Sequence, residues 1–212
     1  MIGTRPAACA ARAPVPRWGD RRRTRIGLLG GSFNPAHEGH LHVARLALRR
    51  LRLDQVWLVV SPGNPLKPVA GMQDFALRLA AACRLADGRR IVASDIEAQL
   101  GTRYTVDTVR ELRRRFPRAA FVWVMGADIL DQLPRWKRWT ELPSRAAMAV
   151  VPRPSYNQRA LAGRAAQRLR RARRPDQRAA ALADMPHPAW TFLPGPQHAA
   201  SATAIRAATS GG

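Results

Sequence analysis

The stretch GGSFNPAHEGH, residues 30–40, combines residue types that suit the binding of phosphate groups. Gly30 and Gly31 allow a ligand to approach the backbone closely, and the Asn-Pro pair that follows is a turn signal. His37 and His40 lie three residues apart at the predicted start of a helix, where unpaired N–H groups and a partial positive charge attract anions. The two imidazoles add further donors, so we interpret this stretch as a phosphate-binding turn.

Two other interpretations of the same stretch stay open. It is a helix-capping turn with two incidental histidines, or the histidines are a pair of metal ligands for which the sequence places no third ligand. Two common nucleotide-binding patterns are excluded, because the stretch contains neither G-x-G-x-x-G nor the Gly-Lys-Ser/Thr of a P-loop.

The elements that position this turn alternate between apolar strands and amphipathic helices, which predicts βαβ units and a parallel sheet. The fold class is therefore α/β, a Rossmann-like doubly wound parallel sheet, with the turn at the carboxyl end of the first strand, where such sheets bind ligands. Strands are predicted over residues 25–30, 55–61, 89–94, 119–126, 146–153 and 189–194. Helices are predicted over residues 39–51, 74–86, 105–116 and 159–178, with a short last helix from residue 201.

Charge and length predict a single domain over residues 25–212, preceded by a disordered Arg/Pro-rich arm over residues 1–24. The chain has 212 residues and a net charge of +22, and only two of its 36 basic residues are lysines. The arginines are concentrated in residues 1–25 and 159–178. We interpret both runs as solvated, with no specific nucleic-acid partner, although a nucleic-acid-binding surface is the alternative.

Other classes of protein are disfavoured by simple features. No apolar run is long enough to span a membrane, and the basic N-terminal stretch lacks the apolar core of a secretory signal. Cys9 and Cys83 form no metal-binding or disulfide pattern, so no metal site is predicted. A cytoplasmic protein is expected, and the oligomeric state stays open.

Further motifs follow the turn in order, and together they resemble one family. GGSFNPAHEGH is similar to the signature of the nucleotidyltransferase superfamily with its His-x-Gly-His element, and is most similar to bacterial nicotinate-nucleotide adenylyltransferases. The later motifs that carry the resemblance are SPGNPLK (61–67), TRYTVDT (102–108), MGAD (125–128), LPRWKRW (133–139), VPRP (151–154) and SATAIR (201–206).

The resemblance implies an enzyme of NAD biosynthesis that transfers AMP from ATP to nicotinate mononucleotide, giving deamido-NAD and pyrophosphate. It implies Mg²⁺ with the ATP, and His40, His37 and Arg206 as the catalytic residues. The ATP-binding residues that it implies are Gly30, Gly31, Ser32, Phe33, His37, His40, Gly126, Asp128, Ser201, Thr203 and Arg206.

For the mononucleotide, the resemblance implies Lys67, Tyr104, Thr105 and Trp136. Trp136 would stack on the nicotinate ring, although Trp139 is a second candidate in the same segment. A sister transferase that uses nicotinamide mononucleotide or phosphopantetheine shares the His-x-Gly-His element. A scaffold with an inactive site is a further alternative.

Overall fold

The computed structural model describes residues 19–63 and 71–196. In these residues a seven-stranded sheet has the order β3-β2-β1-β4-β5-β7-β6, and every pair of neighbouring strands is parallel. The strands are β1 (Arg25–Gly31), β2 (Gln55–Val60), β3 (Ile91–Ser94), β4 (Ala120–Gly126), β5 (Ala147–Val151), β6 (Arg173–Arg174) and β7 (Trp190–Phe192). The predicted α/β class with a parallel sheet is confirmed.

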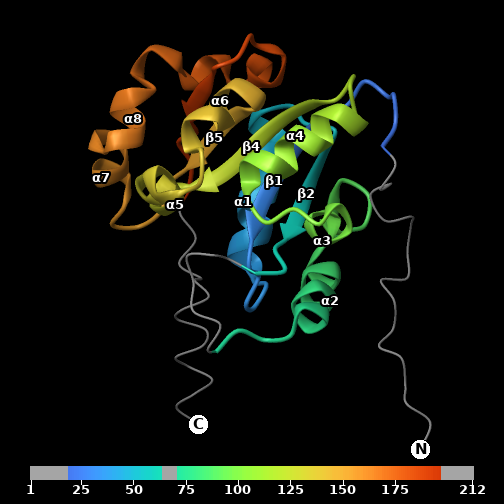
Figure 1. Ribbon diagram of the computed structural model, residues 1–212. Coiled ribbons are helices and arrows are strands. Elements are labelled where there is room, and N and C mark those ends of the chain that lie inside the picture. Colours follow the sequence, from blue (N-terminus) through green and yellow to red (C-terminus); the bar gives the residue numbers. More distant parts are fainter. Residues whose placement is uncertain (1–18, 64–70, 197–212) are drawn as a thin grey trace, which may run out of the picture.

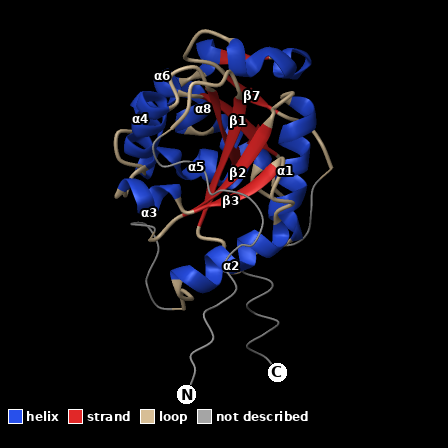
Figure 2. Cartoon of the chain, turned by 90° about the vertical axis from the view of Figure 1, so that its right-hand side faces the viewer, coloured by secondary structure: helices blue, strands red, loops and turns tan. Residues whose placement is uncertain are grey.

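Helices cover both faces of this sheet (Figures 1 and 2). The α-helices are α1 (Glu38–Arg50), α2 (Phe75–Leu85), α3 (Ile96–Leu100), α4 (Thr105–Arg115), α5 (Ala127–Gln132), α6 (Leu142–Arg145), α7 (Asn157–Ala162) and α8 (Arg164–Arg168). The 3-10 helices are η1 (Leu133–Arg135), η2 (Trp139–Glu141), η3 (Arg170–Ala172) and η4 (Asp176–Asp184).

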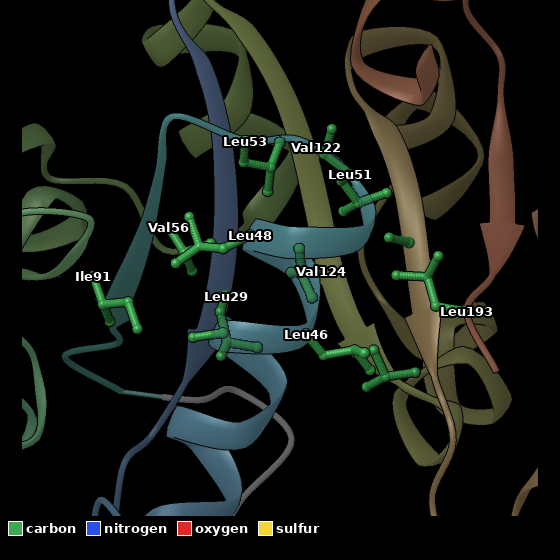
Figure 3. Close-up of a cluster of buried hydrophobic side chains, with 14 of the residues drawn as sticks. Leu29, Leu46, Leu48, Leu51, Leu53, Val56, Ile91, Val122, Val124 and Leu193 are labelled. Atoms are coloured by element: carbon green, nitrogen blue, oxygen red, sulfur yellow. The ribbon is translucent and has the colours of Figure 1, made fainter. Parts of the chain in front are cut away.

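Two apolar cores lie on the two faces, because successive strand residues point to opposite sides. In β4, Phe121 and Trp123 join the core beneath α3 to α8, whereas Val122 and Val124 join the core beneath α1, α2 and η4. Figure 3 shows the second core, in which Leu48 of α1 and Leu51, the residue after this helix, pack towards the strands. Burial on both faces explains why the strand sequences are nearly continuous apolar runs.

The sheet reverses its winding direction between β1 and β4, which are adjacent although β2 and β3 lie between them in sequence. The chain after β1 enters α1, and the chain after β4 enters α5. In doubly wound sheets the crevice at such a reversal, outside the carboxyl ends of the strands, binds the ligand. The phosphate turn and MGAD therefore meet at the carboxyl edge of the sheet.

The predicted single helix over residues 159–178 is wrong. This segment contains α7, α8, η3, the short strand β6 and the start of η4. Gly163 interrupts it as the N-cap of α8, and Pro175 precedes η4. Arginine-rich composition favours a helix, but between these two breaks α8 and η3 are short, and Arg173 and Arg174 pair with β7 instead.

The described chain before β1 is already in contact with the domain. The N–H of Ala120 in β4 donates to the carbonyl of Thr24, at 2.8 Å. A Cβ built on Gly19 would lie 2.0 Å from the carbonyl oxygen of Arg115, so this chain approaches α4 closely. Residues 1–18 lie outside the described residues, and the disordered arm over 1–24 stays a prediction.

Candidate active site

The histidine pair at the start of α1 is held by hydrogen bonds between the two residues and their own backbone. His37 is the N-cap, and its Nδ1 accepts from the N–H of Gly39 at 3.1 Å. Nδ1 of His40 accepts from the N–H of His37 at 3.2 Å, and the ring centroids lie 3.9 Å apart. In a neutral imidazole the nitrogen that accepts has no proton, so this pattern assigns the proton of both rings to Nε2. Each ring therefore has an Nε2–H donor.

The turn that precedes the histidine pair is packed against the aromatic side chains of Phe33 and Trp123. Phe33 is 1% exposed, has a φ of 50°, and its ring lies 4.6 Å from that of His40. A Cβ built on Gly30 would lie 2.6 Å from the Trp123 ring, whereas one on Gly31 would make an ordinary contact with Phe33. The glycine at position 30 is therefore required by the packing of Trp123, a reason that the sequence does not reveal.

The carboxyl end of β4 brings a second group of polar side chains to the same edge. Asp128 in the first turn of α5 faces Arg153, with 3.6 Å between Oδ1 and Nε. Within the described part of the chain, neither of these buried atoms has a hydrogen-bond partner. A Cβ on Gly126 would lie 2.3 Å from Oδ1 of Asp128, so a larger residue at this position would displace the Asp128 side chain. Asp128 and Arg153 thus keep hydrogen-bonding capacity at the switch point.

Arg153 also lies close to the start of α1. A small hollow between α1 and the end of β5 is lined by residues that include Gly39, His42 and Arg153. The phosphate turn, the MGAD turn and the VPRP segment, which are far apart in sequence, therefore surround one region of the carboxyl edge.

The two segments predicted to hold the nicotinate ring are also brought together. Tyr104 is the N-cap of α4, so Thr105 begins the helix and the first N–H groups have no acceptor within it. Lys137, next to Trp136, lies over the Tyr104 ring, with Nζ 4.3 Å from the centroid. Arg138 donates to Asp107 of α4. The Trp136 segment and the start of α4 thus form one unit.

Both candidate tryptophans of this segment are partly buried against the same apolar core, so burial does not choose between Trp136 and Trp139. The Trp136 ring packs edge-on against Trp123, with centroids 6.1 Å apart. Trp123 in turn packs on Gly30 of β1. Trp136 is therefore the tryptophan that the structure connects to the phosphate turn.

Four of the predicted site residues, Lys67, Ser201, Thr203 and Arg206, lie outside the described residues. The described chain before the last three runs along α1. Arg50 near the end of α1 donates to the Pro194 carbonyl at 3.1 Å, and Nε2 of His42 lies 2.8 Å from the Pro196 carbonyl. Between these two contacts the chain advances towards the phosphate turn.

Sequence analysis missed two buried polar residues at this edge, Arg78 and Glu97. Arg78 is 1% exposed, and Glu97, in the unpredicted helix α3, is 6% exposed. Burial raises the pKa of the Glu97 carboxyl, against hydrogen bonds from the Thr108 and Ser61 side chains that lower it. The signal for Arg78 was present in the sequence as a cation in the first turns of an otherwise apolar helical run, whereas the other cation of that run, Arg84, lies in its last turn.

No group of three or more metal-ligating side chains occurs among residues 19–63 and 71–196, so the histidine pair has no third His, Cys, Asp or Glu partner there. The carboxylates at this edge thus form no cage for a resident metal ion. The described helices also include none that is long and apolar enough to cross a membrane.

Comparisons with known proteins identify the family of this chain. The chain matches the cytidylyltransferase-like family over residues 28–208. It is 61% identical over 193 residues to a protein of Gluconacetobacter diazotrophicus named "Probable nicotinate-nucleotide adenylyltransferase", covering 91% of this chain and 90% of that protein. A protein of the same name from Gluconobacter oxydans is 62% identical over 182 residues, covering 86% and 93%.

A solved structure is similar in fold. The nicotinic acid mononucleotide adenylyltransferase of Plasmodium falciparum complexed with NaAD has a TM-score of 0.65, covering 87% of this chain and 83% of that one. Its sequence identity to this chain is 16%, so the likeness concerns the fold alone.

Proposed function

The chain belongs to the family of nicotinate-nucleotide adenylyltransferases, and from this membership we propose that it transfers the AMP of ATP to nicotinate mononucleotide. The products are deamido-NAD, a precursor of NAD, and pyrophosphate. A cytoplasmic location is part of the proposal, since both substrates are anionic metabolites.

The observation that carries this proposal is the histidine pair at the start of α1, whose Nδ1 atoms both accept backbone N–H groups, so that each Nε2 is assigned as a donor. Adenylyl transfer needs fixed donors where negative charge moves from the α-phosphate to the leaving pyrophosphate, and it needs no covalent nucleophile. In the proposed reaction His37 and His40 hold the phosphates of ATP. The backbone of residues 30–33 lies beneath the nucleotide, and Gly126 and Asp128 contact it from β4.

The C-terminal motif supplies the remaining phosphate contacts in this proposal. Ser201 and Thr203 bind the β- and γ-phosphates, and the Arg206 guanidinium stabilises the charge of the leaving group. The path of Pro194 and Pro196 along α1, in the direction of the phosphate turn, supports this assignment. Mg²⁺ enters with ATP as part of the substrate, and it neutralises charge on the phosphate oxygens.

The acceptor lies on the neighbouring segments in this proposal. Trp136 stacks on the nicotinate ring, Lys67 binds the phosphate, and the free N–H groups at Tyr104 and Thr105 bind the nicotinate carboxylate. Lys137 contacts Tyr104, and Arg138 forms an ion pair with Asp107. These contacts support a common pocket formed by Trp136 and the start of α4.

The identity of the acceptor is tested by supplying ATP and Mg²⁺ with nicotinate or nicotinamide mononucleotide and separating the dinucleotide products. A carboxylate accepts from the N–H donors of α4, whereas the amide NH₂ opposes them and leaves buried donors unpaired, at about 1–3 kcal/mol each. We expect a preference for nicotinate of at least about tenfold in kcat/KM. Equal rates with the two mononucleotides would show that the enzyme does not discriminate between them. If neither mononucleotide gave a dinucleotide, adenylyl transfer would be refuted.

A further inference from the structure

Arg78 of α2 is a buried cation whose hydrogen bonds all go to backbone carbonyls of other segments. Its Nε donates to Gln73 at 2.9 Å and its Nη2 to Pro62 at 3.1 Å. Its Nη1 donates to both Ser32, at 2.6 Å, and Ser61, at 2.8 Å. A buried charge is costly unless it is well hydrogen-bonded, so these four contacts explain how Arg78 is accommodated.

The four carbonyls belong to the two sides of the proposed reaction. Ser32 is part of the phosphate turn, two residues before the Asn-Pro bend that leads to α1. Ser61 and Pro62 follow β2 and lead into the chain that carries Lys67, and Gln73 is where that chain returns to α2. The Arg78 guanidinium thus connects the phosphate turn, proposed to bind ATP, to residues on both sides of Lys67, which is proposed to bind the mononucleotide.

The side chain of Asn34 also connects these segments, this time from within the phosphate turn. Nδ2 of Asn34, in the phosphate turn, donates to the Gly71 carbonyl at 2.9 Å. Its Oδ1 accepts from the N–H of Gln73 at 3.2 Å. The residues 71–73 are therefore attached to the phosphate turn through both atoms of one amide and, through Gln73, to Arg78 as well.

We propose that Arg78 is a positioning residue, which fixes residues 61–62 and 73, on either side of Lys67 in sequence, relative to the phosphate turn. This inference rests on the proposed function. In-line transfer needs the acceptor phosphate close to the α-phosphate of ATP, and a misplacement of about 1 Å can cost about 100-fold in rate. A planar guanidinium suits the role, because its donors point in fixed directions towards several carbonyls.

A role in holding α2 alone does not account for these contacts. None of the ion pairs in the described part of the chain includes Arg78, and none of its hydrogen bonds is to the carbonyls of α2 itself. Its one ring contact is with Phe75 one turn earlier, at 5.5 Å from the centroid. The guanidinium therefore acts on the two active-site segments.

The test compares Arg78→Met and Arg78→Lys with two controls in the full-length chain. Arg84→Met makes the same chemical change on the exposed side of α2, and Leu182→Ala lowers stability in the core beneath α1. For Arg78→Met we expect kcat to fall about 100-fold and the KM for nicotinate mononucleotide to rise about tenfold. The KM for ATP should change less than about threefold, because the hydrogen bonds of the histidine pair do not include Arg78.

Arg78→Lys separates positioning from stability. It keeps the charge, but an ammonium cannot span four carbonyls, so we expect it to regain most of the Tm while kcat stays at least about tenfold below wild type. If activity in both variants follows Tm as it does in Leu182→Ala, or if Arg78→Met keeps wild-type kcat, the proposal is overturned. If Arg78→Met does not fold, the Tm and kcat of Arg78→Lys alone decide whether the proposal holds.

A readout without catalysis distinguishes this proposal from the proposed function. The N–H groups of Ser61 and Gln73 are hydrogen-bonded to Gly31 and Asn34, so their hydrogen exchange reports on the attachment. Exchange in both segments should be at least about tenfold faster in Arg78→Lys than in wild type, with α1 unchanged. If wild type does not form deamido-NAD, the proposed function fails, and unchanged exchange would then also refute the role of Arg78.

Discussion

The two edges of the sheet use arginine in opposite ways. At the carboxyl edge one arginine, Arg78, is buried and each of its contacts is to a named carbonyl. At the amino edge a hollow of about 560 Å³ lies beside the first residues of β1 and β4, lined in part by Arg23, Arg25 and Arg118. Arg25 pairs there with Asp184 at 2.6 Å, and Arg23 and Arg118 are exposed.

The difference shows that the number of charges says little about where the chemistry is. Many amino-edge arginines lie in the last turns of helices, such as Arg113–Arg115 of α4, where a cation interacts favourably with the helix dipole. This account gives much of the net charge of +22 a structural use that needs no polyanion as partner. At the carboxyl edge, by contrast, Arg78 is fixed in position by four hydrogen bonds to carbonyls.

The largest effect that separates the edges is expected at His40. Replacing His40 with alanine removes one Nε2–H donor and the hydrogen bond to the N–H of His37. The loss of one preorganised donor costs about 100- to 1000-fold in kcat, so we expect at least a 100-fold decrease in the rate of pyrophosphate release. The matched change at the other edge, Arg118→Ala, should leave kcat within about twofold of wild type. If the His40→Ala protein had normal turnover, the proposed role of the histidine pair in the reaction would be refuted.

A smaller effect is expected at the acceptor side. Trp136→Ala removes the proposed stacking surface, and stacking of a base on an aromatic ring contributes about 1–3 kcal/mol. We expect the KM for nicotinate mononucleotide to rise by about 10- to 100-fold while the KM for ATP is unchanged. Steady-state kinetics of Trp139→Ala provide the comparison. If Trp139→Ala has the larger effect on that KM, the roles of the two tryptophans are reversed.

The pH dependence of stability should distinguish the buried carboxyl of Glu97 from the partly exposed, ion-paired carboxyl of Glu111. The pKa of Glu97 is raised by burial, so its contribution to stability is present below the pKa of the unfolded chain and is lost as pH rises through the folded pKa. Glu97→Gln should remove this loss and stabilise the protein at neutral pH, by on the order of 1 kcal/mol. Denaturant unfolding at several pH values measures both effects.

Glu111 of α4 is the control for that experiment. A hydrogen bond from Arg114 is the main cause that lowers its pKa, so its contribution is present above the unfolded pKa and is lost as pH falls through the folded pKa. Glu111→Gln should therefore weaken the decline in stability at acidic pH. A Glu97→Gln protein with the pH profile of wild type would show that Glu97 does not carry the effect.

The smallest effect is expected at the amino edge. Asp184→Asn breaks the ion pair with Arg25, whose two side chains are 50% and 39% exposed. Exposed pairs contribute about 0–1 kcal/mol and are screened by salt. We expect a decrease in the free energy of unfolding of about 0.5 kcal/mol that vanishes at high salt, with no change in kcat. A loss of activity in Asp184→Asn would contradict the view that only the carboxyl edge takes part in the reaction.

The sequence predicted the frame of the molecule better than the details of its site. Periodicity placed the major strands and α1, α2 and α4, because these elements bury long apolar faces. It missed α3, whose five residues are too few to show a helical period. It also treated 159–178 as one helix, since composition does not show the pairing of β6 with β7.

At the site, the sequence identified the residues of the phosphate turn but not the reasons for all of them. Gly30 was predicted to make room for a ligand, and the structure fills that space with Trp123. Arg78 was missed because a charge in a helix is usually solvated, and only the tertiary structure shows that four carbonyls surround it. Contacts between distant segments are set by packing, which no local pattern encodes.

The distinction between the edges is tested most directly by a crystal structure of the protein with deamido-NAD. We predict the product at the carboxyl edge, with a phosphate oxygen within hydrogen-bonding distance of Nε2 of His37 or His40 and the nicotinate ring on Trp136. A product bound instead in the hollow lined by Arg23 and Arg118, or one whose phosphates do not contact either histidine, would contradict this account.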